Sequence, residues 1–178
     1  MASVTPLIAG NWKMNGIGAA LGEIERLGAL LAATPPRCTV VICPPTTLLS
    51  RLAGVAAVNG IVAGGQDCHP APSGAHTGDV SAAMLADAGA KYVIVGHSER
   101  RTDHHETDAL VLSKARAALG AGLVPIICVG ETRAERESGQ AEAVVASQLA
   151  GSVPDEAAAQ DVVIAYEPVW AIGTGLTP

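Results

Sequence analysis

The sequence Val162-Val163-Ile164-Ala165-Tyr166-Glu167-Pro168 places a carboxylate at the end of a nearly continuous apolar run. Such a run is typical of a strand that is buried on both faces of a parallel sheet. Pro168 ends the strand because it has no N–H to donate to a neighbour. Gly173 and Gly175 follow in a loop whose backbone N–H groups can reach a ligand. The stretch predicts a general base, Glu167, under a covering loop, although an ordinary surface glutamate gives the same pattern.

Five earlier apolar runs are also expected to be strands, over residues 7–11, 39–43, 60–64, 92–95 and 124–129. Segments with helical spacing of apolar residues lie between them. Helices are expected over residues 47–53, from a cap at Asp79 to Ala88, and from a capping box at Thr132 toward Leu149. This alternation predicts a parallel sheet covered by helices. No linker or low-complexity tract divides the chain, so we expect one domain over residues 1–178.

Polar side chains follow the carboxyl ends of four expected strands: Asn11 and Lys13, Gln66, His97, and Glu167. In a closed (β/α)8 barrel these ends converge on one mouth. In an open doubly wound sheet they spread along an edge, and only a switch point gathers them. Because polar residues follow four of the expected strands, we favour the (β/α)8 barrel over the doubly wound sheet. No GxGxxG turn follows the first strand, which argues against a dinucleotide site.

The composition excludes several classes of function. The net charge is −6 with only 11 lysines and arginines, which disfavours nucleic-acid binding but allows a small anionic substrate. No apolar run reaches the ~18 residues of a membrane span. The N-terminus lacks the basic start of a secretory signal, so we expect a cytoplasmic protein. The cysteines lack the spacing of a zinc site or a disulfide framework, and no metal is expected; they are Cys38, Cys43, Cys68 and Cys128.

A base, a neutral electrophile and a fixed cation suit proton abstraction next to a carbonyl group. Glu167 would remove the proton, and His97 would donate a hydrogen bond to the carbonyl oxygen. The helical turn expected after His97 disfavours an imidazolium, so the ring is expected to be neutral. Lys13 would hold a phosphate or a developing enediolate. The N–H of Gly173 would add a donor for the phosphate.

The other histidines, and Arg100 and Arg101, are not expected to act in catalysis. His104 and His105 are expected at the surface. His69 and His76 belong to the long loop 66–78 and are expected to be packing or interface residues. Arg100 is expected to pair with Asp79. A long ordered loop of this kind usually binds a ligand or another subunit.

Four motifs together resemble the triosephosphate isomerase family: GNWKMN at residues 10–15, VGHSERR at 95–101, CVGE at 128–131 and AYEPVWAIGTG at 165–175. The four motifs occur in the same order as in the family, and the resemblance covers the whole chain. It implies a TIM barrel that interconverts dihydroxyacetone phosphate and glyceraldehyde 3-phosphate through an enediolate. It also implies a place in glycolysis and gluconeogenesis, and no metal or cofactor.

The resemblance also assigns roles to particular residues. It places the base on Glu167, the electrophile on His97, and substrate binding on Lys13 and Asn11. Glu99 matches a further active-site position of the family.

The family is typically a homodimer in which the long third loop inserts into the other subunit. Residues 66–79 match that loop, and Thr77 is expected to approach the partner's Asn11. Met14 is expected in the socket that receives the loop.

The length departs from the family pattern. A (β/α)8 barrel takes about 250 residues, and this sequence has 178. We expect about six βα units, no seventh or eighth, and open edges at the first strand and at the strand of Glu167. A fragment, one piece of a split barrel, or a shortened self-associating protein would each explain this. The activity of these residues alone is expected to be far below that of a full barrel. The alternative function is an inactive assembly scaffold.

Overall fold

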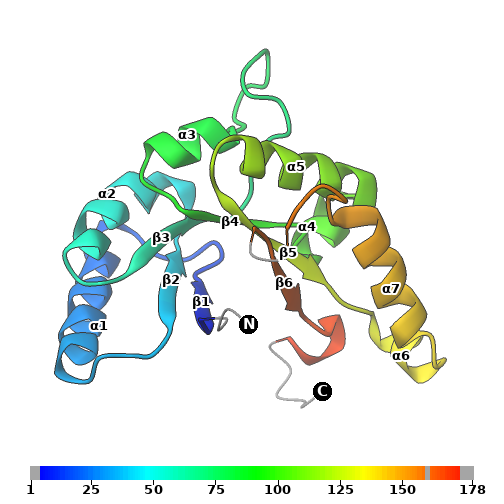
Figure 1. The fold of residues 1–178 in the computed structure, drawn as a ribbon, viewed down its shortest axis with the longest axis horizontal. Helices are drawn as coiled ribbons and strands as arrows, with labels where there is room; N and C mark the ends of the chain where they lie inside the picture. The colour runs from blue at the N-terminus through cyan, green and yellow to red at the C-terminus, as the bar shows by residue number, and fades with distance from the viewer. Residues whose placement is uncertain (1–4, 159–160, 173–178) are drawn as a thin grey trace.

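The computed structural model describes residues 5–158 and 161–172, which form a parallel sheet curled into an arch (Figure 1). The sheet order is β1-β2-β3-β4-β5-β6, so each strand pairs with the next one in the sequence. A doubly wound sheet would reverse this order at a switch point, so that alternative is wrong. The strands are β1 (Leu7–Asn11), β2 (Thr39–Cys43), β3 (Val62–Gly65), β4 (Tyr92–Val95), β5 (Val124–Val129) and β6 (Val163–Tyr166).

Helices cover the outer, convex side of the arch in Figure 1. The larger ones are α1 (Leu21–Ala33), α2 (Thr46–Ala57), α5 (Asp108–Gly120) and α7 (Ala141–Ser152). Shorter ones are α3 (Ala82–Asp87), α4 (Ser98–Asp103) and α6 (Arg133–Glu137), with 3-10 turns η1 (Gly18–Ala20) and η2 (Val169–Ala171). The right-handed crossovers that parallel strands require place these helices on one face.

Alternate residues of the central strands build two separate cores. Val93 and Val95 of β4 pack among the helices, whereas Ile94 between them joins a second cluster. That second cluster consists of Val41, Cys43, Ile94, Ile126 and Cys128 and lies on the opposite face of the sheet. A strand with both faces apolar is the pattern of a buried parallel sheet, and it explains why β2, β4 and β5 are continuous apolar runs.

The outer strands are less buried than the sequence predicts. Ile8 of β1 is 60% exposed, and Ile164 and Tyr166 of β6 are 42% and 49% exposed. Among the described residues β1 pairs only with β2, and β6 pairs only with β5. The expectation that both faces of β6 are buried is therefore wrong for these side chains, whereas the expectation of open edges is confirmed.

The helix preceding β4 begins later than the sequence predicts. Its N-cap is Ser81, whose hydroxyl accepts a hydrogen bond from Met84 N–H, and not Asp79. Serine and aspartate are both good caps, so the sequence could not choose between them. Asp79 instead lies in the preceding loop.

Two other helix boundaries also differ from the expectation. The predicted helix 47–53 extends over Thr46–Ala57 as α2. The segment after Thr132 is two helices instead of one, because Gly139 adopts a positive φ of 74° between α6 and α7. The capping box at Thr132 itself is confirmed.

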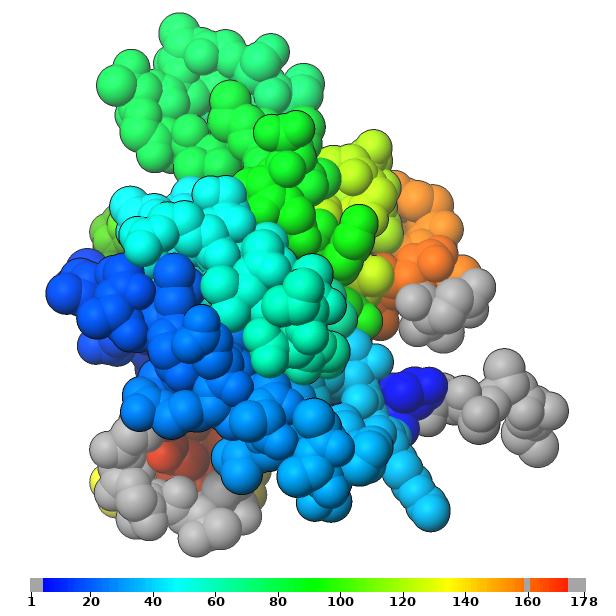
Figure 2. Space-filling view, turned by 90° about the vertical axis from the view of Figure 1, so that its left-hand side faces the viewer, coloured from blue at the N-terminus to red at the C-terminus, as the bar shows by residue number. Residues whose placement is uncertain are grey.

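The loop 66–81 between β3 and α3 stands out from the body of the molecule (Figures 1 and 2). Its neck is closed by a hydrogen bond from His69 N–H to the carbonyl of Val80, at 2.8 Å. The long segment is therefore an ordered protrusion, and its role in binding a ligand or another subunit stays a prediction.

A buried ionic network supports the base of this loop. Lys114 of α5 contacts Asp67 at 2.7 Å and Glu106 at 2.5 Å, and its side chain is only 6% exposed. Arg100 of α4 contacts the same two carboxylates, at 2.9 and 2.7 Å. The predicted pairing of Arg100 with Asp79 is therefore wrong within this chain. Burial alone would raise the pKa of Glu106, but hydrogen bonds from Lys114 and Arg100 outweigh it and lower this pKa.

Replacing Lys114 with methionine is expected to destabilise the fold by about 3–5 kcal/mol, because the buried carboxylate of Glu106 and the partly buried one of Asp67 then share only Arg100. Urea unfolding followed by circular dichroism measures this loss. The matched control is Lys91→Met, which removes an exposed lysine and should cost less than about 0.5 kcal/mol. Equal unfolding midpoints for the two variants would contradict the structural role of Lys114.

Candidate active site

His97 caps the N-terminus of α4 directly after β4. Its Nδ1 accepts a hydrogen bond from the backbone N–H of Glu99, at 3.2 Å. A ring nitrogen that accepts carries no proton, so this hydrogen bond favours the tautomer with the proton on Nε2. The residue is only 8% exposed. This geometry agrees with the neutral ring that the sequence analysis expects, which stays a prediction.

Glu167 contacts both His97 and the start of α4. Its Oε2 lies 3.1 Å from Nε2 of His97, and its Oε1 accepts the N–H of Ser98 at 2.7 Å. The N–H of Glu167 donates to the carbonyl of Val129, so the carboxylate follows directly from the end of the sheet. A side chain at Gly130 would lie 1.9 Å from the carbonyl oxygen of Glu167, so only glycine allows this close approach.

Lys13 lies after β1 with a positive φ of 52°, which is a strained conformation for a lysine. Two side chains hold it there: Asn11 accepts its N–H at 2.9 Å, and the amide of Gln66 donates to its carbonyl at 2.8 Å. The same amide donates to the carbonyl of Cys43 at the end of β2. Gln66 was noted in the sequence only as a strand-end residue, and its role in holding Lys13 becomes evident from the contacts.

Glu99 lies between the lysine and the histidine. Nζ of Lys13 lies 2.6 Å from Oε1 of Glu99, and Oε2 of Glu99 lies 3.5 Å from Nδ1 of His97. Asn11, Lys13, His97 and Glu99 line one cavity of about 650 Å³. Glu167 lines a smaller neighbouring cavity of about 130 Å³ with Ser98 and Cys128. The structure thus brings the predicted polar residues together, with the carboxylate of Glu167 turned toward the start of α4.

The remaining predicted residues lie apart from this contact chain. Met14 lies at the rim of the larger cavity and is 95% exposed. Thr77 is exposed on the protruding loop. Gly173 lies outside the described residues.

Glu131 is a buried acid to which the sequence analysis gave no role. Its side chain is fully buried and accepts hydrogen bonds from the hydroxyl of Tyr166 and from Nε1 of Trp170, at 3.0 and 2.9 Å. The N–H of Val169 also donates to its carbonyl. These contacts fasten the chain on both sides of Glu167. Burial raises the pKa of Glu131, but the hydrogen bonds from Trp170 and Tyr166 outweigh it and hold this pKa below its ordinary value.

Acid–base enzymes built on curled parallel sheets gather polar groups at the carboxyl ends of the strands. The contact between Glu167 and His97, with Lys13 lining the same cavity as His97, places the chain in this class of protein.

Comparison with known proteins gives the family. The profile described as Triosephosphate isomerase matches residues 6–178. The chain is 62% identical over 175 residues to the triosephosphate isomerase of Afipia carboxidovorans, covering 98% of this chain and 70% of the relative. It is 62% identical over 172 residues to that of Ruegeria pomeroyi, covering 97% and 68%. The crystal structure of triosephosphate isomerase from Bartonella henselae superposes with a TM-score of 0.89 at 51% identity, covering 94% of this chain and 69% of that chain.

The chain belongs to the triosephosphate isomerase family, and its arch has the TIM-barrel fold. This confirms the family resemblance and favours an isomerase over an assembly scaffold. The chain spans about 70% of the length of these relatives.

Glu131→Gln is expected to lower stability at pH 7 by roughly 1–3 kcal/mol, since charge-assisted hydrogen bonds become neutral ones. Because the folded-state pKa of Glu131 is lowered, its stabilising effect is complete above the ordinary value of 4.5 and disappears as pH falls through the folded-state pKa. The difference between the wild-type protein and this variant should therefore shrink below about pH 4.5.

Urea unfolding followed by tryptophan fluorescence at several pH values measures this difference. Glu137→Gln, at an acid whose side chain is 64% exposed, should show almost no difference from the wild-type protein. A Glu131→Gln effect that stays constant down to pH 3 would show that the ionised form is not the stabilising one.

Proposed function

We propose that the chain interconverts dihydroxyacetone phosphate and glyceraldehyde 3-phosphate by proton transfer through an enediolate, a reaction of glycolysis and gluconeogenesis. The proposal depends above all on the 3.1 Å contact between Glu167 and Nε2 of the neutral His97. A carboxylate base and an uncharged N–H donor within reach of each other are what enolisation of a carbonyl compound requires. The names of the relatives agree with this substrate.

The geometry indicates how each group would act. Glu167 is held by Ser98 N–H, so it must leave this donor and turn toward the larger cavity to reach a substrate carbon. The Nε2 proton of His97 then becomes free to bind the substrate oxygen as negative charge develops. Lys13 lies on the wall of that cavity and would hold the phosphate or the enediolate, in place of its present contact with Glu99. Asn11 lines the same wall and would bind substrate beside it.

Two further residues complete the assignment. Glu99 would act as an active-site residue by holding Lys13 before substrate binds. The N–H of Gly173 remains the expected phosphate donor of the covering loop. The proposed chemistry uses only proton transfer and hydrogen bonding by side chains and backbone, and so calls for no metal or cofactor.

Glu167→Gln is expected to lower kcat by at least about a hundredfold, because the amide cannot accept the carbon-bound proton. A coupled assay with glyceraldehyde 3-phosphate measures turnover, and circular dichroism checks that the fold is unchanged. Glu99→Gln is the comparison, since it alters a charge in the same contact chain without removing the base. Turnover close to wild type in Glu167→Gln would eliminate Glu167 as the base.

We also infer that the partner is a second copy of this chain. Met14 and Ile17 both follow β1 and are apolar, yet they are 95% and 78% exposed, and Met14 lines the larger cavity. The protruding loop 66–81 has the shape of an element that enters such a surface (Figure 2). Thr77 on that loop would then approach the partner's Asn11. A protomer with one protrusion and one apolar socket can form a two-fold symmetric pair.

We assign this pair to the cytoplasm, where its proposed sugar-phosphate substrates are metabolised. Among the described residues, no helix is both long and apolar enough to span a bilayer.

Met14→Glu is expected to weaken this dimer at least tenfold, because it places a charge in the proposed apolar socket. Sedimentation equilibrium measures the dissociation constant. Val58→Glu is the matched control: Val58 is 84% exposed at the end of α2, so its dimer should be unchanged. Equal dissociation constants for the two variants would place the interface elsewhere.

A further inference from the structure

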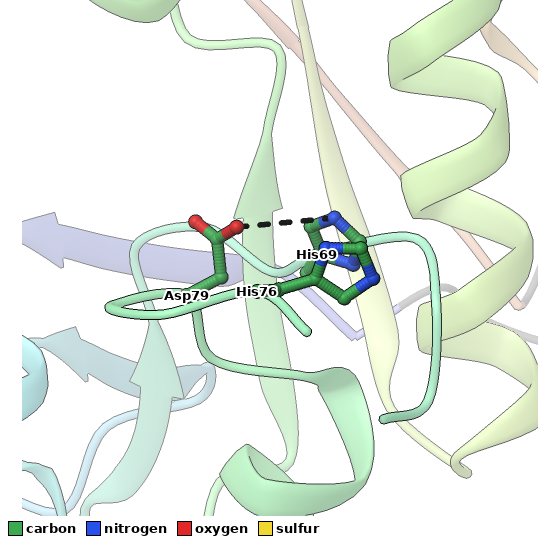
Figure 3. A group of neighbouring side chains, drawn as sticks. All are labelled: His69, His76 and Asp79. Carbon is green, nitrogen blue, oxygen red and sulfur yellow. Dashed lines mark ion pairs between the residues drawn. The ribbon is translucent and has the colours of Figure 1, made fainter. Parts of the chain in front are cut away.

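Polar side chains also gather outside the candidate active site. On the protruding loop, the rings of His69 and His76 lie side by side with Asp79 facing them (Figure 3). That loop is the element proposed to enter the second copy of the chain, so these three side chains belong to the proposed dimer. Another group surrounds Arg101 of α4, which lines the smaller cavity with Glu167.

Arg101 contacts the backbone on both sides of His97. Its N–H donates to the carbonyl of His97 at 3.0 Å, one helical turn away. Its Nε donates at 2.8 Å to the carbonyl of Gly96, which belongs to the peptide bond that joins Gly96 to His97. One residue therefore holds both the peptide group before the histidine and the carbonyl group after it.

The same guanidinium joins the ends of two neighbouring strands. The pairing of β4 with β5 runs as far as Val95 opposite Ile127, and the next residues are Gly96 and Cys128. Nη2 of Arg101 donates to the carbonyl of Cys128 at 3.2 Å, while Nε holds the carbonyl of Gly96. Two carbonyl oxygens cannot hydrogen-bond to each other, and the guanidinium supplies a donor to each.

Groups on two other helices hold the guanidinium in place. Nη1 lies 2.6 Å from Oδ1 of Asp108 at the start of α5, and Nη2 donates at 3.1 Å to the hydroxyl of Ser152 at the end of α7. That hydroxyl donates in turn to Asp108 at 3.1 Å. Ser152 is fully buried, and the side chain of Arg101 is 16% exposed. Because a guanidinium presents its donors in a rigid plane, these anchors also fix its contacts with Gly96 and Cys128.

We propose that Arg101 is a positioning residue for His97, because its side chain holds the Gly96–His97 peptide group against the end of β5. His97 is the N-cap of α4, and its Nδ1 accepts the N–H of Glu99 only while its backbone keeps the cap geometry. A peptide group that is free to turn would carry the ring with it and weaken that hydrogen bond. This role rests on the proposed function, since the position of His97 matters to turnover only if the ring is the electrophile.

The test is NMR of the isotopically labelled full chain, because the chemical shifts of the two ring nitrogens of His97 report its tautomer. In mildly alkaline buffer these two signals should be well separated in the wild-type chain. Arg101→Lys keeps a positive charge beside Asp108 but has one ammonium group in place of the planar donors. We expect the two ring signals to move toward each other in this variant, because the two tautomers then mix.

The matched control is Ser152→Ala, which removes one anchor of the guanidinium and leaves Arg101 in contact with both strand-end carbonyls. It should lower stability in urea yet leave the ring signals of His97 at their wild-type positions. A second measurement uses only the wild-type chain. The Nε–H of Arg101 should exchange with solvent at least about tenfold more slowly than that of Arg133, whose side chain is 70% exposed.

Unchanged ring signals in folded Arg101→Lys would overturn the proposal, as would exchange of the Arg101 Nε–H as fast as that of Arg133. Equal shifts in Arg101→Lys and Ser152→Ala would also overturn it, because a general loosening of the network would then explain both.

None of these measurements depends on turnover, so they are separate from the test of the proposed function, whose failure would appear as absence of isomerase activity in the wild-type chain. In the active chain, Arg101→Lys should lower kcat at least about tenfold while KM changes less than about twofold.

Discussion

The hydrogen bond from the backbone N–H of Glu99 to Nδ1 of His97 determines what the candidate site can do. It favours the tautomer of the ring in which the Nε2 proton faces Glu167. The backbone N–H of Ser98, at the same helix start, donates to Oε1 of Glu167, the oxygen that does not face His97. A single helix N-terminus therefore orients both groups, since its unpaired N–H groups must find acceptors and these two side chains supply them.

Local patterns were enough to predict most of the fold. The continuous apolar runs gave the strands because parallel strands are covered on both faces. The same reasoning failed at Ile164 and Tyr166, since an apolar run does not report how many neighbours its strand has. It also failed at Asp79, because Ser81 two residues later is an equally good cap. The partners of Arg100 could not be predicted, because they depend on where α5 places Lys114.

The positions of the polar groups were predictable, and their contacts were not. Glu167 and His97 follow strand ends, and strand ends meet in a barrel-type sheet. Glu131 looked like any other acid in the sequence because its partners, Tyr166 and Trp170, are more than thirty residues away along the chain. The catalytic roles of Glu167, His97 and Lys13 stay predictions.

Deamidation of Gln66 would act directly on the backbone at Lys13. Its amide nitrogen is shared between the carbonyls of Lys13 and Cys43, at 2.8 and 2.9 Å. Spontaneous loss of ammonia from this side chain would turn a double donor into a carboxylate that can only accept. Attraction to two carbonyl oxygens would become repulsion, and the strained lysine would lose the support that keeps it in place. The loss of one ammonia molecule would then loosen Lys13 without breaking any peptide bond.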